Sequence, residues 1–227
     1  MNRNNQQIIK ELCKAYKSDV KYGDIPNESF AGPSSYFSQE ALKACKNDFL
    51  GERHIEMVYA TLVSWGMHRS GKGGAKVPKF SEYKESIVRN RVQLDALKGK
   101  HIERLTRNEF EEISGILKKL CFGENGIVGS CTKSRIVSSS KTLAHILPDL
   151  VPPIDRQYTA SFFGYNKNNI SFRQEKELFD RVMHIIYELY QTKDIVECAK
   201  KLINDPLLTL PKLFDNVLIA LQNEKNC

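Results

Sequence analysis

The chain has 227 residues, a hydrophobic fraction of 41% and a net charge of +7 at pH 7. This length and apolar content suffice for one large or two small domains with a buried core. Because no run of about 18 apolar residues occurs and the N-terminal residues lack the apolar core of a secretory signal, the sequence excludes a membrane partner and predicts a cytoplasmic location.

Apolar residues recur at helical spacing along most of the chain. The first stripes lie at residues 8–16 and at residues 55–63, where the second ends at Trp65. Thr106 and Glu109 have the spacing of a capping box, and the helix they open closes at Gly123. Further stripes cover residues 178–189, 195–203 and 213–221. Since alternating strand patterns are scarce, the sequence predicts an all-α, compact multi-helix fold.

The predicted loops are too short to be clear interdomain linkers. They cover residues 23–35, 71–78, 123–134, 164–172 and 205–211. The sequence therefore predicts a single helical domain over residues 1–227. Lobes of residues 1–123 and 124–227 are the division we expect if the domain has two parts.

Cysteine and histidine spacing indicates neither a metal site nor a cofactor. There is no CxxC motif, and no two histidines have the i, i+4 spacing of a helical metal pair. The wide, irregular spacing of the six cysteines favours reduced thiols that pack as small apolar side chains.

Positive charge is concentrated in the middle of the chain. Basic and acidic residues balance over residues 1–52, basic residues exceed acidic ones by 8 over residues 53–141, and the excess over residues 142–227 is −1. Such a segment suits a surface that meets a polyanion, although a solvated helical face has the same composition. The candidate nucleic-acid-binding residues are Arg69, Lys72, Lys76, Lys133, Arg135 and Ser140.

Two of these lysines lie in the glycine-rich loop SGKGGAK at residues 70–76. Glycines expose backbone N–H groups that bind phosphate, but the GxxxxGK[ST] spacing of a P-loop is absent. A basic turn that contacts a nucleic-acid backbone and a plain surface loop both fit this composition.

The segment KSRIVSSSKTLAHILPDLVPPIDRQYTASFFGY at residues 133–165 contains a lysine and an aspartate at two successive predicted helix starts. A helix over residues 142–147 rises about 1.5 Å per residue, whereas the proline-rich return run over residues 148–154 covers up to roughly 3.3 Å per residue. The chain can therefore bring Asp155 level with Lys141.

A lysine acts as a nucleophile only when its amine is neutral, which requires a desolvated site or a positive field. The serines at residues 138–140 are suited to cap the helix, and the partial positive charge of a helix N-terminus disfavours the ammonium form of Lys141. His145 lies one turn further on the same face and is suited to influence that amine. The alternatives are an exposed lysine in a first helical turn and an N-cap role for Asp155.

Residues 120–163 resemble the helix-hairpin-helix DNA glycosylases of base excision repair. The resemblance implies that Lys141 is the nucleophile, that Thr142 is the residue after it, and that Asp155 is the catalytic aspartate. The serines at residues 138–140 stand where that family has hairpin glycines, and the lysine-to-aspartate spacing is shorter by roughly one helical turn. The segments TLVSWGMHRSG and SKTLAHILPDLVPPIDRQYT also resemble a group of prokaryotic proteins with no established activity.

The resemblance implies a DNA-binding base-excision enzyme, a DNA glycosylase/AP lyase with DNA as its partner. Such enzymes extrude a nucleotide and hold its base against stacking side chains. The candidate pocket residues are Trp65, His145 and Tyr158, and Phe162 and Phe163 are further stacking candidates. A non-catalytic helical nucleic-acid-binding protein and a protein-interaction module with a basic face fit the same charge pattern.

Overall fold

All regular elements among the described residues are helical. The computed structural model describes residues 4–18, 32–69, 76–128 and 135–224. The elements are α1 (Asn5–Tyr16), α3 (Pro33–Asn47), α4 (Glu52–Ser64), α5 (Phe80–Arg89), α6 (Arg91–Leu97), the 3₁₀ turn η1 (Ile102–Arg104), α7 (Arg107–Phe122), α8 (Arg135–Ile146), the π turn η2 (Arg156–Ala160), α9 (Phe172–Tyr190), α10 (Lys193–Leu202) and α11 (Leu210–Glu224). The all-α prediction is thus confirmed for this part of the chain.

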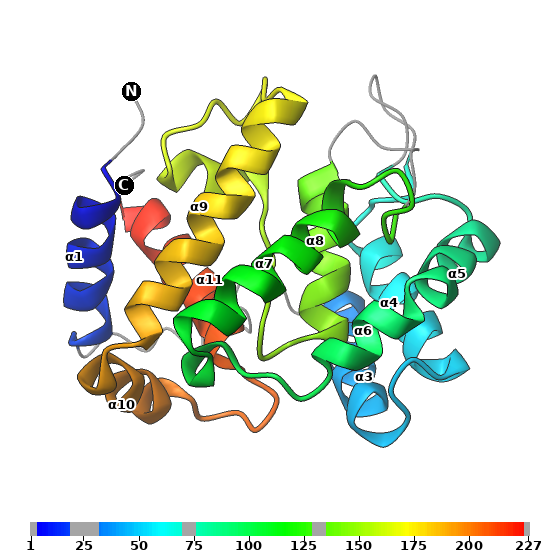
Figure 1. Ribbon diagram of the computed structural model, residues 1–227, viewed down its shortest axis with the longest axis horizontal. Helices are drawn as coiled ribbons and strands as arrows, with labels where there is room; N and C mark the ends of the chain where they lie inside the picture. The colour runs from blue at the N-terminus through cyan, green and yellow to red at the C-terminus, as the bar shows by residue number, and fades with distance from the viewer. Residues whose placement is uncertain (1–3, 19–31, 70–75, 129–134, 225–227) are drawn as a thin grey trace.

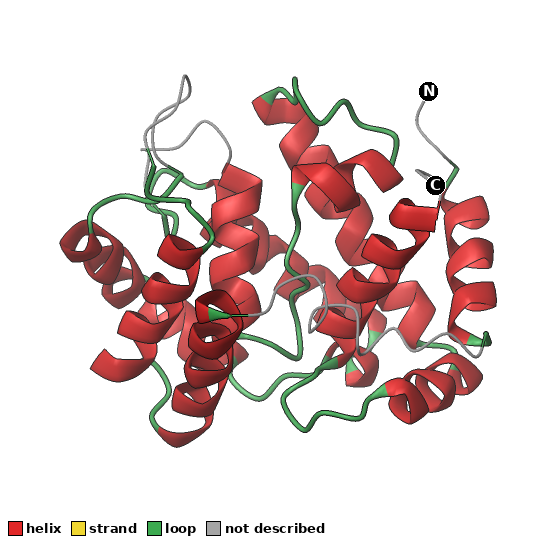
Figure 2. Ribbon diagram, turned by 180° about the vertical axis from the view of Figure 1, so that it is seen from behind, coloured by secondary structure: helices red, strands yellow, loops and turns green. Residues whose placement is uncertain are grey.

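Helices α7 and α8 lie between two groups of helices (Figure 1), with α3 to α6 on one side and α1 and α9 to α11 on the other. The view from behind shows the same two groups (Figure 2), and α8 contacts α3, α4, α7 and α9. A single hydrophobic cluster extends from Ile8 in α1 to Ala220 in α11. No helix within the described ranges is long and apolar enough to cross a membrane.

The predicted start and end of α7 are confirmed. The Thr106 hydroxyl accepts a hydrogen bond from the Glu109 backbone N–H at 3.3 Å, and the Glu109 carboxylate accepts one from the Thr106 N–H at 2.9 Å. This reciprocal pair satisfies two of the N–H groups that a helix start leaves without partners. Gly123 is the C-cap residue.

Helices α3, α5 and α6 were not predicted from the sequence. Only Ala41 and Ala44 of α3 are buried, so its apolar stripe is made of small residues and is weak. The loop predicted over residues 23–35 is wrong at its end, because Pro33 begins α3 after the Gly32 N-cap. Proline is favoured at a first helical position because its fixed φ suits the helix and its missing N–H costs nothing there.

Two tyrosines attach α1 to the C-terminal helices. Tyr190 of α9 donates a hydrogen bond to the Leu210 carbonyl oxygen at 2.7 Å, and its hydroxyl lies 2.6 Å from that of Tyr16 in α1. Since the Tyr190 hydrogen is used on Leu210, Tyr16 is the donor to Tyr190. Both rings are buried and meet edge to face, with centroids 6.0 Å apart.

The start of α8 differs from the prediction. The helix begins at Arg135, so Ser138, Ser139 and Ser140 lie in its interior and are buried, and the expectation that they cap a helix is wrong. Their small side chains fit the crowded centre of the fold, and their hydroxyls find buried partners, as buried polar groups must. The Ser140 hydroxyl accepts from the Ile154 N–H at 3.0 Å.

Asp155 opens η2 as its N-cap. Its Oδ1 accepts a hydrogen bond from the Tyr158 backbone N–H at 2.7 Å. The preceding residues Val151 to Ile154 are buried and carry no helix, as their prolines predict. The two hydrogen bonds between the Ser140 hydroxyl and the Ile154 backbone attach this return segment to α8.

The four cysteines among the described residues are free thiols, namely Cys13, Cys45, Cys121 and Cys198. This agrees with the expectation that these side chains pack as small apolar groups, since Cys121 is buried and the other three are partly buried. Cys131 and Cys227 lie outside the described residues.

Candidate functional site

The Lys141 side chain packs on Trp65. Its Nζ lies 4.8 Å from the centroid of the indole ring, and both residues are partly buried. Trp65 is the C-cap residue of α4, so the contact joins the end of α4 to the middle of α8. Lys141 comes six residues after the first residue of α8, which is about 9 Å along the axis. The prediction that a helix N-terminus perturbs this amine is therefore wrong.

Burial perturbs the Lys141 amine instead. It lowers the pKa of Lys141, the charges of Asp155 and Asp215 oppose that change, and the charges of Lys212 and Lys76 reinforce it. The net direction is downward, because removing water from an ammonium group disfavours its charged form. A larger fraction of Lys141 is thus neutral at a given pH than of an ordinary lysine.

Asp155 lies within electrostatic range of Lys141. No ion pair within 4.0 Å joins the two side chains, both of which are described. One carboxylate oxygen of Asp155 caps η2, so the N-cap role and a charge next to the lysine occur together. The sequence had offered these as alternatives.

His145 lies one turn after Lys141 and is held as a neutral ring. Its Nδ1 lies 2.8 Å from the Lys141 carbonyl oxygen, so this nitrogen carries the hydrogen, and Nε2 then accepts from the Ser38 hydroxyl at 3.0 Å. Burial lowers the pKa of His145 to about 4. Its ring centroid lies 5.6 Å from that of Trp65. His145 therefore packs beside the lysine and the indole without adding charge at neutral pH.

Three residues near this site were not predicted: Ser38 of α3, and Lys212 and Asp215 of α11. Lys212 Nζ lies 2.6 Å from Asp215 Oδ2, and the Asp215 side chain is 7% exposed. In the sequence Asp215 interrupts the apolar stripe of residues 213–221 and Lys212 lies one turn before it, which is the signal that could have marked the pair. We name the cluster of Trp65, Lys141, Asp155, Lys212 and Asp215 the lysine site.

The predicted nucleic-acid-binding residues have different surroundings. Arg69 and Lys76 are exposed, and Lys76 is close enough to the lysine site to lower the pKa of Lys141. Lys72 and Lys133 lie outside the described residues. The Arg135 guanidinium lies 5.2 Å from the centroid of the exposed Phe172 ring.

Ser140 does not fit its predicted role in nucleic-acid binding. Its relative exposure is 0%, and its hydroxyl bonds to the Ile154 backbone. Phe162 and Phe163 are also core residues and do not fit the stacking role. Tyr158 is partly buried beside Asp155.

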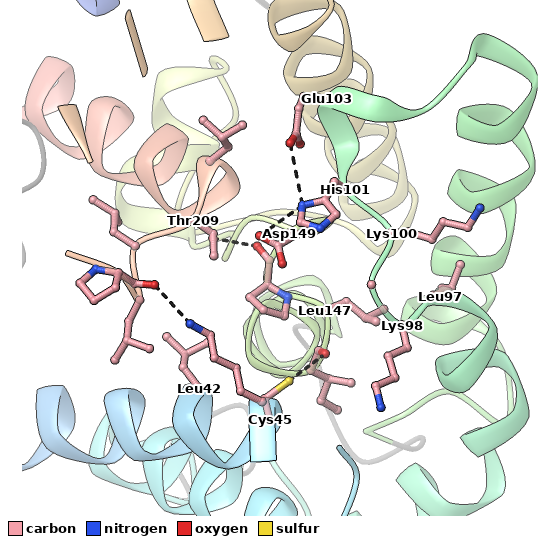
Figure 3. A pocket seen from close by; sticks show the side chains of 18 of the residues that line it. Leu42, Cys45, Leu97, Lys98, Lys100, His101, Glu103, Leu147, Asp149 and Thr209 are labelled. Carbon is pink, nitrogen blue, oxygen red and sulfur yellow. Dashed lines mark hydrogen bonds and ion pairs between the residues drawn. The ribbon is translucent and has the colours of Figure 1, made fainter. Parts of the chain in front are cut away.

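A separate cavity of about 450 Å³ lies at the C-terminal end of α8 (Figure 3). His101 Nδ1 lies 3.8 Å from carboxylate oxygens of both Glu103 and Asp149 there. Burial raises the pKa of the Cys45 thiol to about 11, so this thiol is not an activated nucleophile. None of the predicted site residues that the structure describes lines the cavity.

Within the described ranges, no group of three or more histidine, cysteine, aspartate or glutamate residues is placed to hold a metal ion. No protein-family model, curated protein or solved structure matches the chain. The lysine site thus has to be interpreted from its own chemistry.

Proposed function

We propose that this protein is a base-excision enzyme, a DNA glycosylase with AP-lyase activity, in which Lys141 is the nucleophile and Asp155 stabilises the positive charge that develops on the sugar. The observation that carries the proposal is a desolvated lysine amine on an indole ring, with a carboxylate in electrostatic range but not in contact. A lowered amine pKa is the property that a Schiff-base lysine requires.

The proposed reaction begins with attack of the neutral Lys141 amine on C1′ of a damaged nucleotide. The bond between C1′ and the base breaks, and the base leaves with its electron pair and takes a proton from solvent. As the sugar ring opens, one amine proton passes to O4′ and a protonated Schiff base remains on Lys141. Asp155 carries the negative charge that favours the oxocarbenium-like transition state.

The surroundings of Lys141 are suited to an extruded nucleotide. Trp65 presents an aromatic face beside the amine, and base stacking on aromatic side chains is a general mode of nucleic-acid binding. Arg69 and Lys76 are exposed cations on the same segment of chain, beyond the end of α4. Cations in such a position neutralise backbone phosphates.

Borohydride trapping tests the proposal. The wild-type protein is incubated with duplex oligonucleotides that carry an abasic site or one of a broad panel of damaged bases, and the Schiff base is reduced to a stable amine. We expect a covalent adduct that Lys141→Gln abolishes. Lys193→Gln, at an exposed lysine in α10, is the matched control and should retain the adduct.

The absence of any Lys141-dependent adduct across the panel would refute the nucleophilic role. A non-catalytic nucleic-acid-binding protein is the second candidate, and the exposed Arg69 and Lys76 favour it equally. It predicts that Lys141→Gln binds DNA as tightly as the wild type and that neither protein forms an adduct.

A further inference from the structure

The ion pair between the half-exposed Lys212 and the buried Asp215 is a feature that the proposed chemistry does not use. Lys212 Nζ and Asp215 Oδ2 are 2.6 Å apart on successive turns of α11, and burial raises the pKa of Asp215. Isolated carboxylates are costly to bury, so a residue in this position needs a partner. Lys212 is that partner.

The first turn of α11 is attached directly to the end of α8. The Thr209 hydroxyl donates to the Pro148 carbonyl oxygen at 2.8 Å and accepts from the Lys212 backbone N–H at 3.4 Å. Helix α11 also packs against η2, whose N-cap is Asp155. The positive charge of Lys212 lowers the pKa of both Lys141 and His145, which lie one turn apart on α8. These contacts place the ion pair beside the reactive stretch of α8.

The Asp215 carboxylate opposes the proposed role of Lys141 as a nucleophile. A carboxylate close to a lysine stabilises the ammonium form, and the ammonium form has no lone pair with which to attack. Asp155 already exerts this effect on Lys141. A second carboxylate without its own cation would add to it and suppress the neutral amine.

We propose that Lys212 is a positioning residue for Lys141: it holds the Asp215 carboxylate in an ion pair within α11 and so prevents this carboxylate from pairing with the Lys141 amine. This inference rests on the proposed function for its purpose, but the arrangement of charges is testable without DNA. Lys212 itself takes no part in bond making. Its effect is to increase the neutral fraction of Lys141 in a site that contains two aspartates.

Among the residues that the structure describes, the charged and titratable groups that act on Lys141 come from η2, α11, α8 and the residue Lys76 before α5. They are Asp155 at the start of η2, Lys212 and Asp215 from α11, Lys76 before α5, and His145 from α8 itself. His145 is neutral above about pH 4, so it does not obscure a titration near neutral or basic pH. Trp65 contributes no charge.

The test is a direct titration of Lys141. Lysines of the full-length protein are reductively methylated with ¹³C, and the signal of Lys141 is identified by its absence in Lys141→Arg. Lys212→Met removes a positive neighbour and releases Asp215, so the Lys141 titration should move to higher pH. Asp215→Asn removes the negative neighbour, so it should move to lower pH.

The double variant Lys212→Met/Asp215→Asn should return the titration close to that of the wild type, and Lys212→Arg should leave it unchanged. Lys193→Met, at an exposed lysine of α10, is the matched control. Unchanged titration in both single variants, or a double variant that resembles Lys212→Met, would overturn the proposal. If Lys212→Met does not fold, Lys212→Gln takes its place, and an upward shift of the Lys141 titration is again expected, whereas an unchanged titration would reject the role of Lys212.

The titration and the trapping experiment test separate claims, so a negative result in one does not decide the other. A Lys141 titration that responds as described, without any DNA adduct, would remove the base-excision function and leave the ion-pair role intact. An adduct whose pH dependence is the same in wild type and Lys212→Met would retain the function and reject the role of Lys212.

Discussion

Burial and two hydrogen bonds keep the His145 ring neutral in the folded protein. Its ring is 5% exposed, and both nitrogens are engaged, Nδ1 with the Lys141 carbonyl oxygen and Nε2 with the Ser38 hydroxyl. A second proton would have to go on Nε2, which would lose its acceptor role toward Ser38. Protonation therefore opposes folding, consistent with the lowered pKa of this group.

A pH dependence of stability follows from this lowered pKa. The folded pKa of about 4 lies below the ordinary value of 6.5, so the contribution is fully present above pH 6.5 and is lost as pH falls toward 4. Between pH 7 and pH 5 the free energy of unfolding should fall by about 2 kcal/mol on account of His145. Urea unfolding at both pH values measures it.

His145→Gln is the comparison for this measurement. In this variant the free energy of unfolding should fall by about 2 kcal/mol less between pH 7 and pH 5 than in the wild type, whatever its stability at pH 7. An equal pH dependence in wild type and variant would show that His145 does not carry the effect.

At the residue scale, part of the lysine site was predictable. Lys141 and Trp65 do meet in the lysine site and His145 packs beside them, and the i, i+4 relation of Lys141 and His145 follows from helical periodicity alone. Asp215 was not predictable, because its proximity to Lys141 depends on the packing of α11 on η2, about 70 residues further along the chain. No local pattern encodes that contact.

Helix α8 is the element whose boundaries matter most for the site. It was predicted to begin next to Lys141 because serine is a strong N-cap residue. Inside the fold, tertiary packing overrides that preference, and the buried hydroxyls bond to carbonyl groups instead. Local propensity is a weak guide where small polar side chains permit close packing.

The link between α8 and the return segment can be tested at Ser140. Its hydroxyl accepts from the Ile154 N–H at 3.0 Å, and Ser140→Ala would leave this buried N–H without a partner. An unpaired buried donor costs about 1–3 kcal/mol. We expect the variant to lose this amount in free energy of unfolding, measured by urea titration at pH 7.

Ser139→Ala is the matched control for that loss, since Ser139 is equally buried on the same helix. Its hydroxyl donates to the Cys121 carbonyl oxygen, and an under-satisfied carbonyl is better tolerated than an orphaned N–H. Equal losses in the two variants would contradict a specific role for the Ile154 bond.

For the whole molecule, the charge division predicts how the proposed binding of DNA depends on salt. The excess of positive charge over residues 53–141 includes the exposed Arg69 and Lys76, whereas residues 142–227 carry a small negative excess. Binding through phosphates releases counterions, so log affinity should fall linearly with log salt concentration. Fluorescence anisotropy with a labelled duplex measures the slope.

Single variants identify which residues contact DNA phosphates. Lys76→Gln should reduce the magnitude of the slope by about 0.9, the contribution of one phosphate contact. Lys193→Gln, in the segment without a positive excess, should leave the slope unchanged. An absence of binding at low salt would remove the polyanion interpretation of the basic segment.

The tyrosine pair has a consequence for synthesis. Tyr16 and Tyr190 are 174 residues apart, so α1 leaves the ribosome long before the helix that receives it. At about 5–20 residues per second, the wait is roughly 9–35 s. During this time the Tyr16 ring and hydroxyl lack Tyr190, so this attachment of α1 can form only after the C-terminal helices have been made.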